Sequence, residues 1–245
     1  GGSPSIGEWD FSNLPDMAFM FNGYPHGPMA FNQDIGGWDV SKVTTMRQMF
    51  GGTERFDQDI GGWDTGNVEN MRSVFFRAKA FDQDIGGWDT GNVTNMRSVF
   101  NGAESFNQDI SRWDVSSAEN MEFMFREATS FNNGGSPGIS EWDVSGVTDM
   151  RGMFAGAESF DQDLSRWDVS GVQQFQDGLG GFLEGAGLSP KNYDRTLIGW
   201  AVQNLSEGLT LGAEGVSYCN SGPFREHLEE AFGWDVSDGG VEDSC

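Results

Sequence analysis

The chain has 245 residues, with 38 acidic and 14 basic side chains and a formal net charge of −24. Nucleic acids and anionic membranes reward Lys and Arg, so this charge argues against both as partners. The chain lacks the run of roughly 18 apolar residues that a membrane span needs, and the sequence therefore predicts no membrane span.

One block of 25 residues recurs along most of the chain. Residues 81–105 read FDQDIGGWDTGNVTNMRSVFNGAES, and residues 56–80 and 106–130 are close copies. Each block carries a Trp-Asp pair, and the tryptophans are Trp9, Trp38, Trp63, Trp88, Trp113, Trp142 and Trp167. Self-similarity at such a period is typical of repeat proteins. We expect a solenoid of about seven turns over residues 1–172.

Each block shows two patterns. Val93, Met96, Phe100 and Ala103 follow spacings of three and four, which predicts a short helix. Residues 84–90, DIGGWDT, have no helical period and predict a short extended segment between bends. The expected fold class is thus an α/β repeat solenoid, with one short parallel strand and one short helix per turn. Stacking would bury all seven tryptophans, together with the methionines.

Two insertions interrupt the period. Four extra residues fall between Phe21 and Phe31, in a stretch that holds Tyr24, Pro25, His26 and Pro28. Four more fall in the block that begins at Phe131, which contains GGSP at 134–137. Insertions in solenoids map to loops that often bind ligands, although simple loop drift is the alternative.

The first residues also resemble part of a later block. Residues 1–9, GGSPSIGEW, match residues 134–142, GGSPGISEW, so the sequence opens within a repeat. An uncovered solenoid end exposes its core and a strand edge. We expect upstream repeats or another copy of the chain to cover this end.

The repeat pattern ends after Val172, and residues 173–245 are expected to cap the last repeat. Ser189 and Pro190 predict the start of a helix that runs to about Gln203. Residues 209–218 predict a strand, and residues 221–232 predict a second helix that ends at Gly233.

Both cysteines, Cys219 and Cys245, lie in this cap. A disulfide that pins the C-terminus is the simplest interpretation, and it would imply an oxidising, extracellular setting. Two free thiols in a cytosolic protein are the alternative.

Four short motifs carry a resemblance to a known family: FNQDI at 31–35, WDVS at 113–116, VTDM at 147–150 and MFAGA at 153–157. They resemble the repeat of the BspA-like leucine-rich-repeat surface proteins, and the likeness covers residues 8–172. The tail also resembles the C-terminal cap of such arrays. The resemblance implies a leucine-rich-repeat-like solenoid on a secreted or cell-anchored protein that is associated with adhesion. Here Gly-Gly replaces the family's Ser-x after Ile35, Ile60 and Ile85, which we expect to loosen the bend.

Polar residues recur as ladders. Gln33, Gln58, Gln83, Gln108 and Gln162 form one ladder, which could grip a glycan or an extended peptide or be a solvated face. Arginines at 47, 72, 97 and 151 form another, which Glu122 interrupts. Stacked Asp34, Asp59, Asp84 and Asp109 could bind Ca²⁺, but capping of turns by these carboxylates is the favoured interpretation. Candidate ligand-binding residues are the glutamine ladder, Tyr24 and His26.

Catalysis has little support in the sequence. The two histidines, His26 and His227, lie at opposite ends of the chain, which argues against a Ser-His-Asp set. We expect no cofactor and a non-enzymatic recognition or adhesion module that binds a protein or glycan at a cell surface or matrix. The alternatives are a structural subunit that stacks end to end and, third, a polysaccharide hydrolase.

Overall fold

A computed structural model describes residues 6–9, 11–24, 26, 27, 29–176, 178, 181–242 and 245. Its regular elements lie mostly at the C-terminal end: helix α1 (Pro190–Trp200), strand β1 (Thr210–Ala213), helix α2 (Gly222–Phe232) and strand β2 (Asp235–Asp238). Three short 3-10 helices precede them: η1 (Ile6–Glu8), η2 (Asn133–Gly135) and η3 (Pro137–Glu141).

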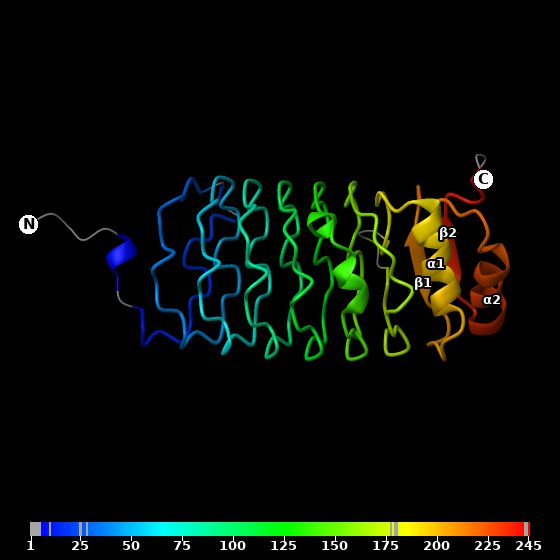
Figure 1. Ribbon diagram of the computed structural model, residues 1–245, viewed down its shortest axis with the longest axis horizontal. Helices are drawn as coiled ribbons and strands as arrows, with labels where there is room; N and C mark the ends of the chain where they lie inside the picture. Colours follow the sequence, from blue (N-terminus) through cyan, green and yellow to red (C-terminus); the bar gives the residue numbers. More distant parts are fainter. Residues whose placement is uncertain are drawn as a thin grey trace, which may run out of the picture.

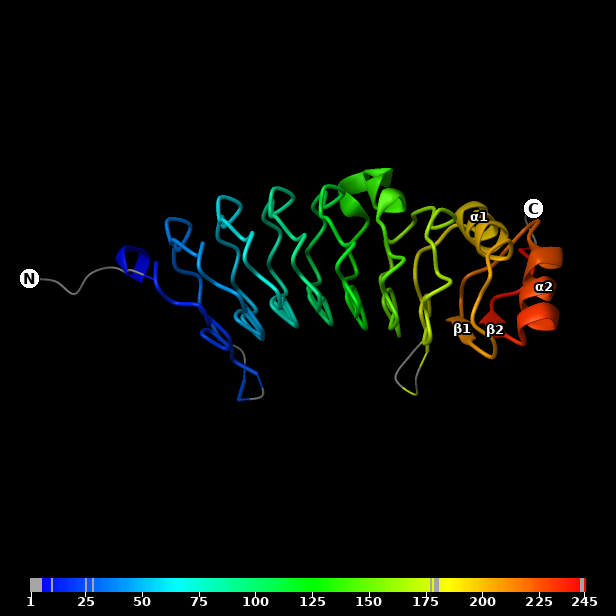
Figure 2. The same cartoon turned by 90° about the horizontal axis from the view of Figure 1, so that it is seen from below.

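The blocks of the sequence form coils that follow one another along the long axis of the molecule (Figure 1). The same order of coils is seen after a quarter turn, with α1, β1, β2 and α2 together at one end (Figure 2). Parallel bridges join equivalent residues of neighbouring coils, and the bridged positions are Asp16, Thr45, Asn70, Asn95, Asn120, Asp149 and Gln174. The spacing of the repeat thus sets the register of the stack.

The segment expected to be helical in each block is instead bonded to the next coil. The backbone N–H groups of Met96, Ser98 and Phe100 donate to carbonyls of the following coil, at 2.8–2.9 Å. Ser98 has a φ of 56°, which turns the chain between these bonds. The prediction of a short helix per turn is therefore wrong, because the alternating bonds between coils and tight turns also bury residues at spacings of three and four.

The segment expected to be a strand forms two turns. Asp84 Oδ1 accepts from the N–H of Gly86 at 3.0 Å, and Asp89 Oδ1 accepts from the N–H of Gly91 at 3.1 Å. The parallel backbone pairing between coils lies instead on the segment that was expected to be helical, around residues 95–100. Whether the stack belongs to the leucine-rich-repeat class stays a prediction.

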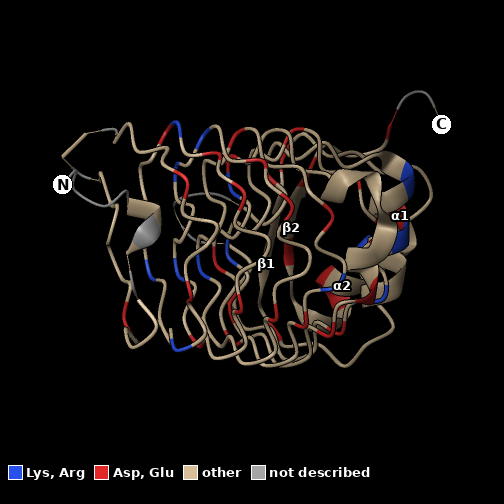
Figure 3. Ribbon diagram, turned by 60° about the vertical axis from the view of Figure 1, so that its left-hand side comes forward, with Lys and Arg blue, Asp and Glu red and all other residues tan. Residues whose placement is uncertain are grey.

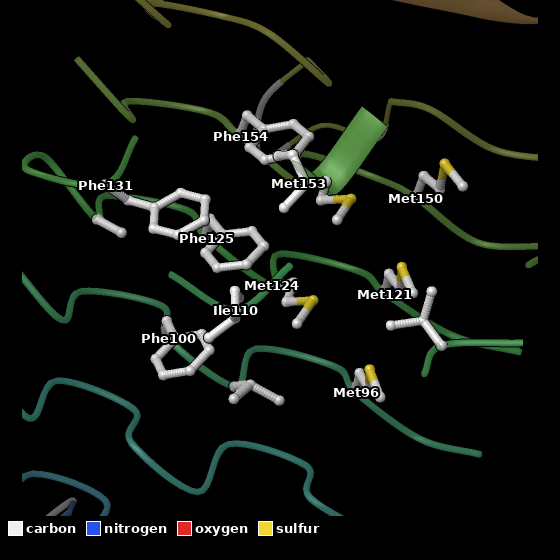
Figure 4. Packing of buried hydrophobic residues seen from close by; sticks show 14 of the residues in the cluster. Met96, Phe100, Ile110, Met121, Met124, Phe125, Phe131, Met150, Met153 and Phe154 are labelled. Carbon is white, nitrogen blue, oxygen red and sulfur yellow. The ribbon is translucent and has the colours of Figure 1, made fainter. Parts of the chain in front are cut away.

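Like residues stack on like residues in the core, as the phenylalanine and methionine rows in Figure 4 show. The Phe100 ring lies 5.6 Å from that of Phe75 and 5.5 Å from that of Phe125. Trp88 is buried and its indole lies parallel to that of Trp63, 6.2 Å away. Six of the seven repeat tryptophans are buried, but Trp9 is 50% exposed, so its prediction as a core residue is wrong.

The two glycines that follow the isoleucine, Gly86 and Gly87 in the third regular block, differ in how closely the next coil approaches them. A Cβ on Gly86 would lie 2.4 Å from the backbone oxygen of Asp109 in the next coil. A Cβ on Gly87 would meet no atom within 4 Å. The first glycine of the pair therefore lets the next coil approach closely, and a looser bend stays a prediction.

The C-terminal region continues the stack. The side chain of Ser189 caps α1 by accepting from the N–H of Asn192, and the indole N–H of Trp200 donates to the carbonyl of Leu164. Residues 181–187 pair with the preceding coil, and β1 and β2 are parallel, with Leu211 opposite Val236. Helix α2 ends at Gly233 in the left-handed conformation, as predicted.

Candidate ligand-binding face

The side chains on the outside of the paired segment form what we call the ladder face. Three rows of equivalent positions define it, each running from coil to coil. The first row is Thr45, Asn70, Asn95, Asn120 and Asp149; the second is Arg47, Arg72, Arg97, Glu122 and Arg151; the third is Gly51, Phe76, Asn101, Arg126 and Ala155. Because the parallel bridges fix the coils, these rows are held in register.

The arginine row divides into paired and unpaired members. Glu122 is 2% exposed and accepts ion pairs from Arg97 at 2.7 Å and from Arg151 at 3.2 Å. Arg47 and Arg72 form no ion pair with any described carboxylate. Burial lowers the pKa of Arg72, and the neighbouring charges of Arg97 and Arg47 lower it further, against an opposing effect of Glu122. The part of the row at Arg47 and Arg72 is thus a site of unbalanced positive charge.

The asparagine row beside it offers hydrogen-bond donors. Asn70 Oδ1 accepts from the N–H of Arg72 at 3.0 Å, and Asn95 Oδ1 accepts from the N–H of Arg97 at 3.1 Å. These bonds fix the carbonyl side of each amide. The Nδ2 groups of Asn70 and Asn95 form no hydrogen bond within the described part of the chain. They are free to donate to a ligand.

One exposed aromatic ring lies next to Arg47, and a second lies beside Arg77 and Phe76. The guanidinium of Arg47 lies 5.1 Å from the ring centre of Phe19, which is 46% exposed. Arg77 lies 5.6 Å from the ring centre of Tyr24, which is 45% exposed, and Tyr24 packs edge-on against Phe76. Large exposed apolar groups of this kind are typical of interaction surfaces.

Elsewhere on the coils the acidic residues prevail, and Figure 3 shows blue segments recurring on neighbouring coils among the red ones. Many of these carboxylates hold turns. Hydrogen bonds from the hydroxyl and N–H groups of the serine two residues later lower the pKa of Asp109, Asp114 and Asp143. These negative charges thus belong to the scaffold.

The predicted glutamine ladder is bonded within the stack. The side-chain amide of Gln83 donates to Asp57 of the preceding coil at 2.7 Å, and Gln108 donates to Asp82 at 2.8 Å. Gln58 and Gln162 donate in the same way to Asn32 and Asn132. Gln33 is exposed. Four of the five amides donate a hydrogen bond to a neighbouring coil, so the ladder offers a ligand fewer free donors than its sequence suggests.

The other candidate residues are placed as follows. Tyr24 adjoins the ladder face through its edge-on contact with Phe76, and His26 is exposed. Pro25 and Pro28 lie outside the described residues. The calcium candidates Asp34, Asp59, Asp84 and Asp109 each accept from the N–H two residues later. In the described ranges no three His, Cys, Asp or Glu side chains are grouped to hold a metal ion.

One surface hollow of about 370 Å³ brings two carboxylates together, those of Asp84 and Asp109, beside Arg112. A glycosidase needs one carboxyl group with a raised pKa to act as the acid. The pKa of Asp109 is instead lowered by its bonds to Ser111. This shift argues against Asp109 as the acid of such a reaction.

The disulfide between Cys219 and Cys245 is present, with a Cα–Cα distance of 5.7 Å. No described helix has both the length and the apolar character needed to cross a membrane.

Sequence reasoning did not select the ladder face as a binding site. The arginine ladder was visible in the sequence, but the unpaired state of Arg47 and Arg72 was not. The usable signal was Glu122, because a single acidic residue in a basic row balances only the members next to it.

Comparison with known proteins identifies one family. The model of the family described as "Mycoplasma protein of unknown function, DUF285" matches residues 3–93, 59–137 and 135–184. Searches of curated proteins and of solved structures gave no match. Since the matched ranges together span most of the chain, the chain belongs to the DUF285 family.

Proposed function

We propose that this protein is a secreted or cell-surface recognition module, without enzymatic activity, that binds a protein or glycan through its ladder face. The proposal includes a leucine-rich-repeat-like solenoid of the BspA-like kind. The observation that carries it is the set of unpaired donors at Arg47, Asn70 and Arg72, with the exposed ring of Phe19 against Arg47. The disulfide supports an oxidising location.

A rigid stack suits recognition because it presents its side chains without the entropy cost of ordering a loop. Every backbone group that pairs the coils also fixes the position of a surface side chain. Variation along the rows supplies specificity: Arg, Arg, Arg, Glu and Arg in one row, and Gly, Phe, Asn, Arg and Ala in the next.

A glycan and protein array tests the proposal. We expect selective binding that is lost in the Arg47→Ala/Arg72→Ala variant and kept in an Arg112→Ala/Arg166→Ala control. Arg112 and Arg166 occupy the row of Gly87, off the ladder face, and their removal changes the net charge equally. Binding that both variants retain would place the site elsewhere.

The end-to-end structural subunit gives a different result. Light scattering would then show particles that grow with concentration, whereas a recognition module keeps a constant mass. Growth in the absence of any ligand would favour the structural role.

A further inference from the structure

We propose that the ligand of the ladder face is an acidic polysaccharide, whose carboxylate or sulfate groups are bound by Arg47, Arg72 and the amides of Asn70 and Asn95. This inference rests on the proposed function and names the class of ligand.

The donors repeat with the coils. Thr45, Asn70 and Asn95 are joined by parallel bridges, so the arginines two residues further on are held about one strand spacing apart, ~4.8 Å. Burial lowers the pKa of Arg72, and the like charges of Arg97 and Arg47 lower it further. A chain that brings anionic groups at intervals would relieve this repulsion, and charge-assisted hydrogen bonds to guanidinium groups are the strong ones.

The backbone of the face argues against an extended acidic peptide. The N–H groups of Met46, Gln48 and Phe50 all donate to carbonyls of the next coil. Peptides that bind by strand addition need a free sheet edge, and the flank of a paired stack offers none. A polysaccharide needs no backbone partner, and it can be held by side chains alone.

The aromatic rings fit the same ligand. Phe19 and Tyr24 are each nearly half exposed and lie against Arg47 and Arg77. Such a ring offers an apolar surface to the C–H face of a sugar, beside a cation for its acidic group. Burial of sugar rings there would add to the electrostatic attraction.

The net charge of −24 does not prevent this binding but does limit it. At physiological ionic strength the screening length is about 8 Å, so a bound anion interacts mainly with the nearest arginines. A nucleic acid would also place unbound phosphates over the acidic surface, and its affinity depends on many neutralised phosphates. Short anionic stretches with neutral sugars between them suit a patch of two free arginines better.

The test is titration calorimetry of the full chain with five probes at matched residue concentration: polygalacturonate, dextran sulfate, neutral dextran, poly-glutamate and single-stranded DNA. We expect binding to at least one of the two acidic polysaccharides, and weakening at 0.5 M salt. Tighter binding of polygalacturonate would identify carboxylate as the recognised group, and tighter binding of dextran sulfate would identify sulfate. The Arg47→Ala/Arg72→Ala variant should lose about tenfold or more in affinity, since hydrogen bonds to charged groups are the stronger ones. The Arg47→Lys/Arg72→Lys variant should recover part of it, and the Arg112→Ala/Arg166→Ala control should match the parent.

Three results would overturn the inference: equal binding of neutral dextran, equal or tighter binding of poly-glutamate or DNA, and no binding of either acidic polysaccharide. Thermal melts of all variants show that they are folded. The inference fails alone if the array finds another partner that still depends on Arg47 and Arg72. The proposed function fails too if the array finds no partner that depends on them.

Discussion

At the scale of single residues, the indole N–H of most buried repeat tryptophans donates to the backbone of the preceding coil. Trp88 Nε1 donates to the carbonyl of Ile60 in the preceding coil at 3.0 Å, and Trp63 and Trp113 do the same with Ile35 and Ile85. Trp142 is equally buried, but its Nε1 has no acceptor among the described residues. The insertion lies in the stretch of η2 and η3, just before Trp142, where the period is broken.

This difference predicts unequal costs for the same substitution. Trp88→Phe should lower the free energy of unfolding by about 1 kcal/mol more than Trp142→Phe, because only Trp88 gives up a hydrogen bond. Both variants lose similar apolar volume, so Trp142→Phe is the matched control. Urea unfolding of both proteins measures the difference, and equal costs would contradict the assignment of the bond.

The carboxylate of Asp194 in helix α1 holds the backbone of residues 219–221 within the C-terminal region. Asp194 is 7% exposed and accepts from the N–H groups of Cys219, Asn220 and Ser221 at 2.9–3.1 Å. Burial alone would raise its pKa, but these hydrogen bonds outweigh burial and hold the pKa below its ordinary value of 3.8.

The sign of the pH effect follows from this shift. A carboxyl group with a lowered folded pKa stabilises the fold above its unfolded pKa, and the contribution is lost as the pH falls through the folded pKa. Asp194→Asn should cost about 1–3 kcal/mol at pH 6, since it disturbs a buried charged acceptor. Urea titrations at pH 6 and pH 3 should show that the difference in free energy of unfolding between the variant and the parent is smaller at pH 3. A difference that stays constant would mean that the charge of Asp194 does not contribute.

At the scale of elements, the two glycines of the turn have different roles. Gly86 faces the backbone of the next coil, whereas Gly87 faces open space. Where the first glycine is replaced by Ser111, the next coil departs from the regular path through η2 and η3. Ser165 also occupies this position, and the segment that packs on its coil is helix α1. Gly199 of α1 lies close to the Ser165 carbonyl. At Gly36, Gly61 and Gly86, by contrast, a backbone carbonyl of the next coil occupies the space that a Cβ would fill.

Alanine substitutions separate the two roles. Gly86→Ala should destabilise the protein by about 1–3 kcal/mol, because the new methyl group overlaps the Asp109 carbonyl. Gly87→Ala should be neutral or stabilise by up to about 1 kcal/mol, since it only restricts the unfolded chain. Thermal or urea unfolding compares them, and a destabilising Gly87→Ala with a neutral Gly86→Ala would reverse our assignment.

The elements also show what a sequence reveals. The start of α1 at Ser189–Pro190 and the end of α2 at Gly233 were predictable, because caps depend on local chemistry. The helix expected at residues 93–103 was not correct, because spacing reports which residues are buried but not where backbone N–H groups find partners. The positive φ of Ser98 could not be predicted, because serine does not indicate a left-handed backbone conformation. The prediction of a binding site at the glutamine ladder did not anticipate that four of its five amides bond the preceding coil.

At the scale of the whole molecule, the backbone pairing continues from the repeats into the C-terminal region. Phe154 pairs with Phe182, Leu183 with Gly212, and β1 with β2. The expected division at residue 172 therefore coincides with a change of sequence pattern while the pairing of backbones goes on. The Cys219–Cys245 disulfide links the C-terminal residue to this region. A loop of this size contributes roughly 3 kcal/mol to the free energy of unfolding in the chain-entropy model.

The face, the core rows and the tryptophan bonds all depend on stacking in which each residue lies beside its equivalent in the next block. Cysteine cross-linking measures this register directly. Asn70 and Asn95 are bridge partners, so the Asn70→Cys/Asn95→Cys variant should form a disulfide on mild oxidation, identified by mass spectrometry of the digested protein. The Asn70→Cys/Asn101→Cys variant has a similar separation but lies out of register, and it should remain reduced. Equal cross-linking of the two pairs, or cross-linking of the second pair alone, would contradict the stack.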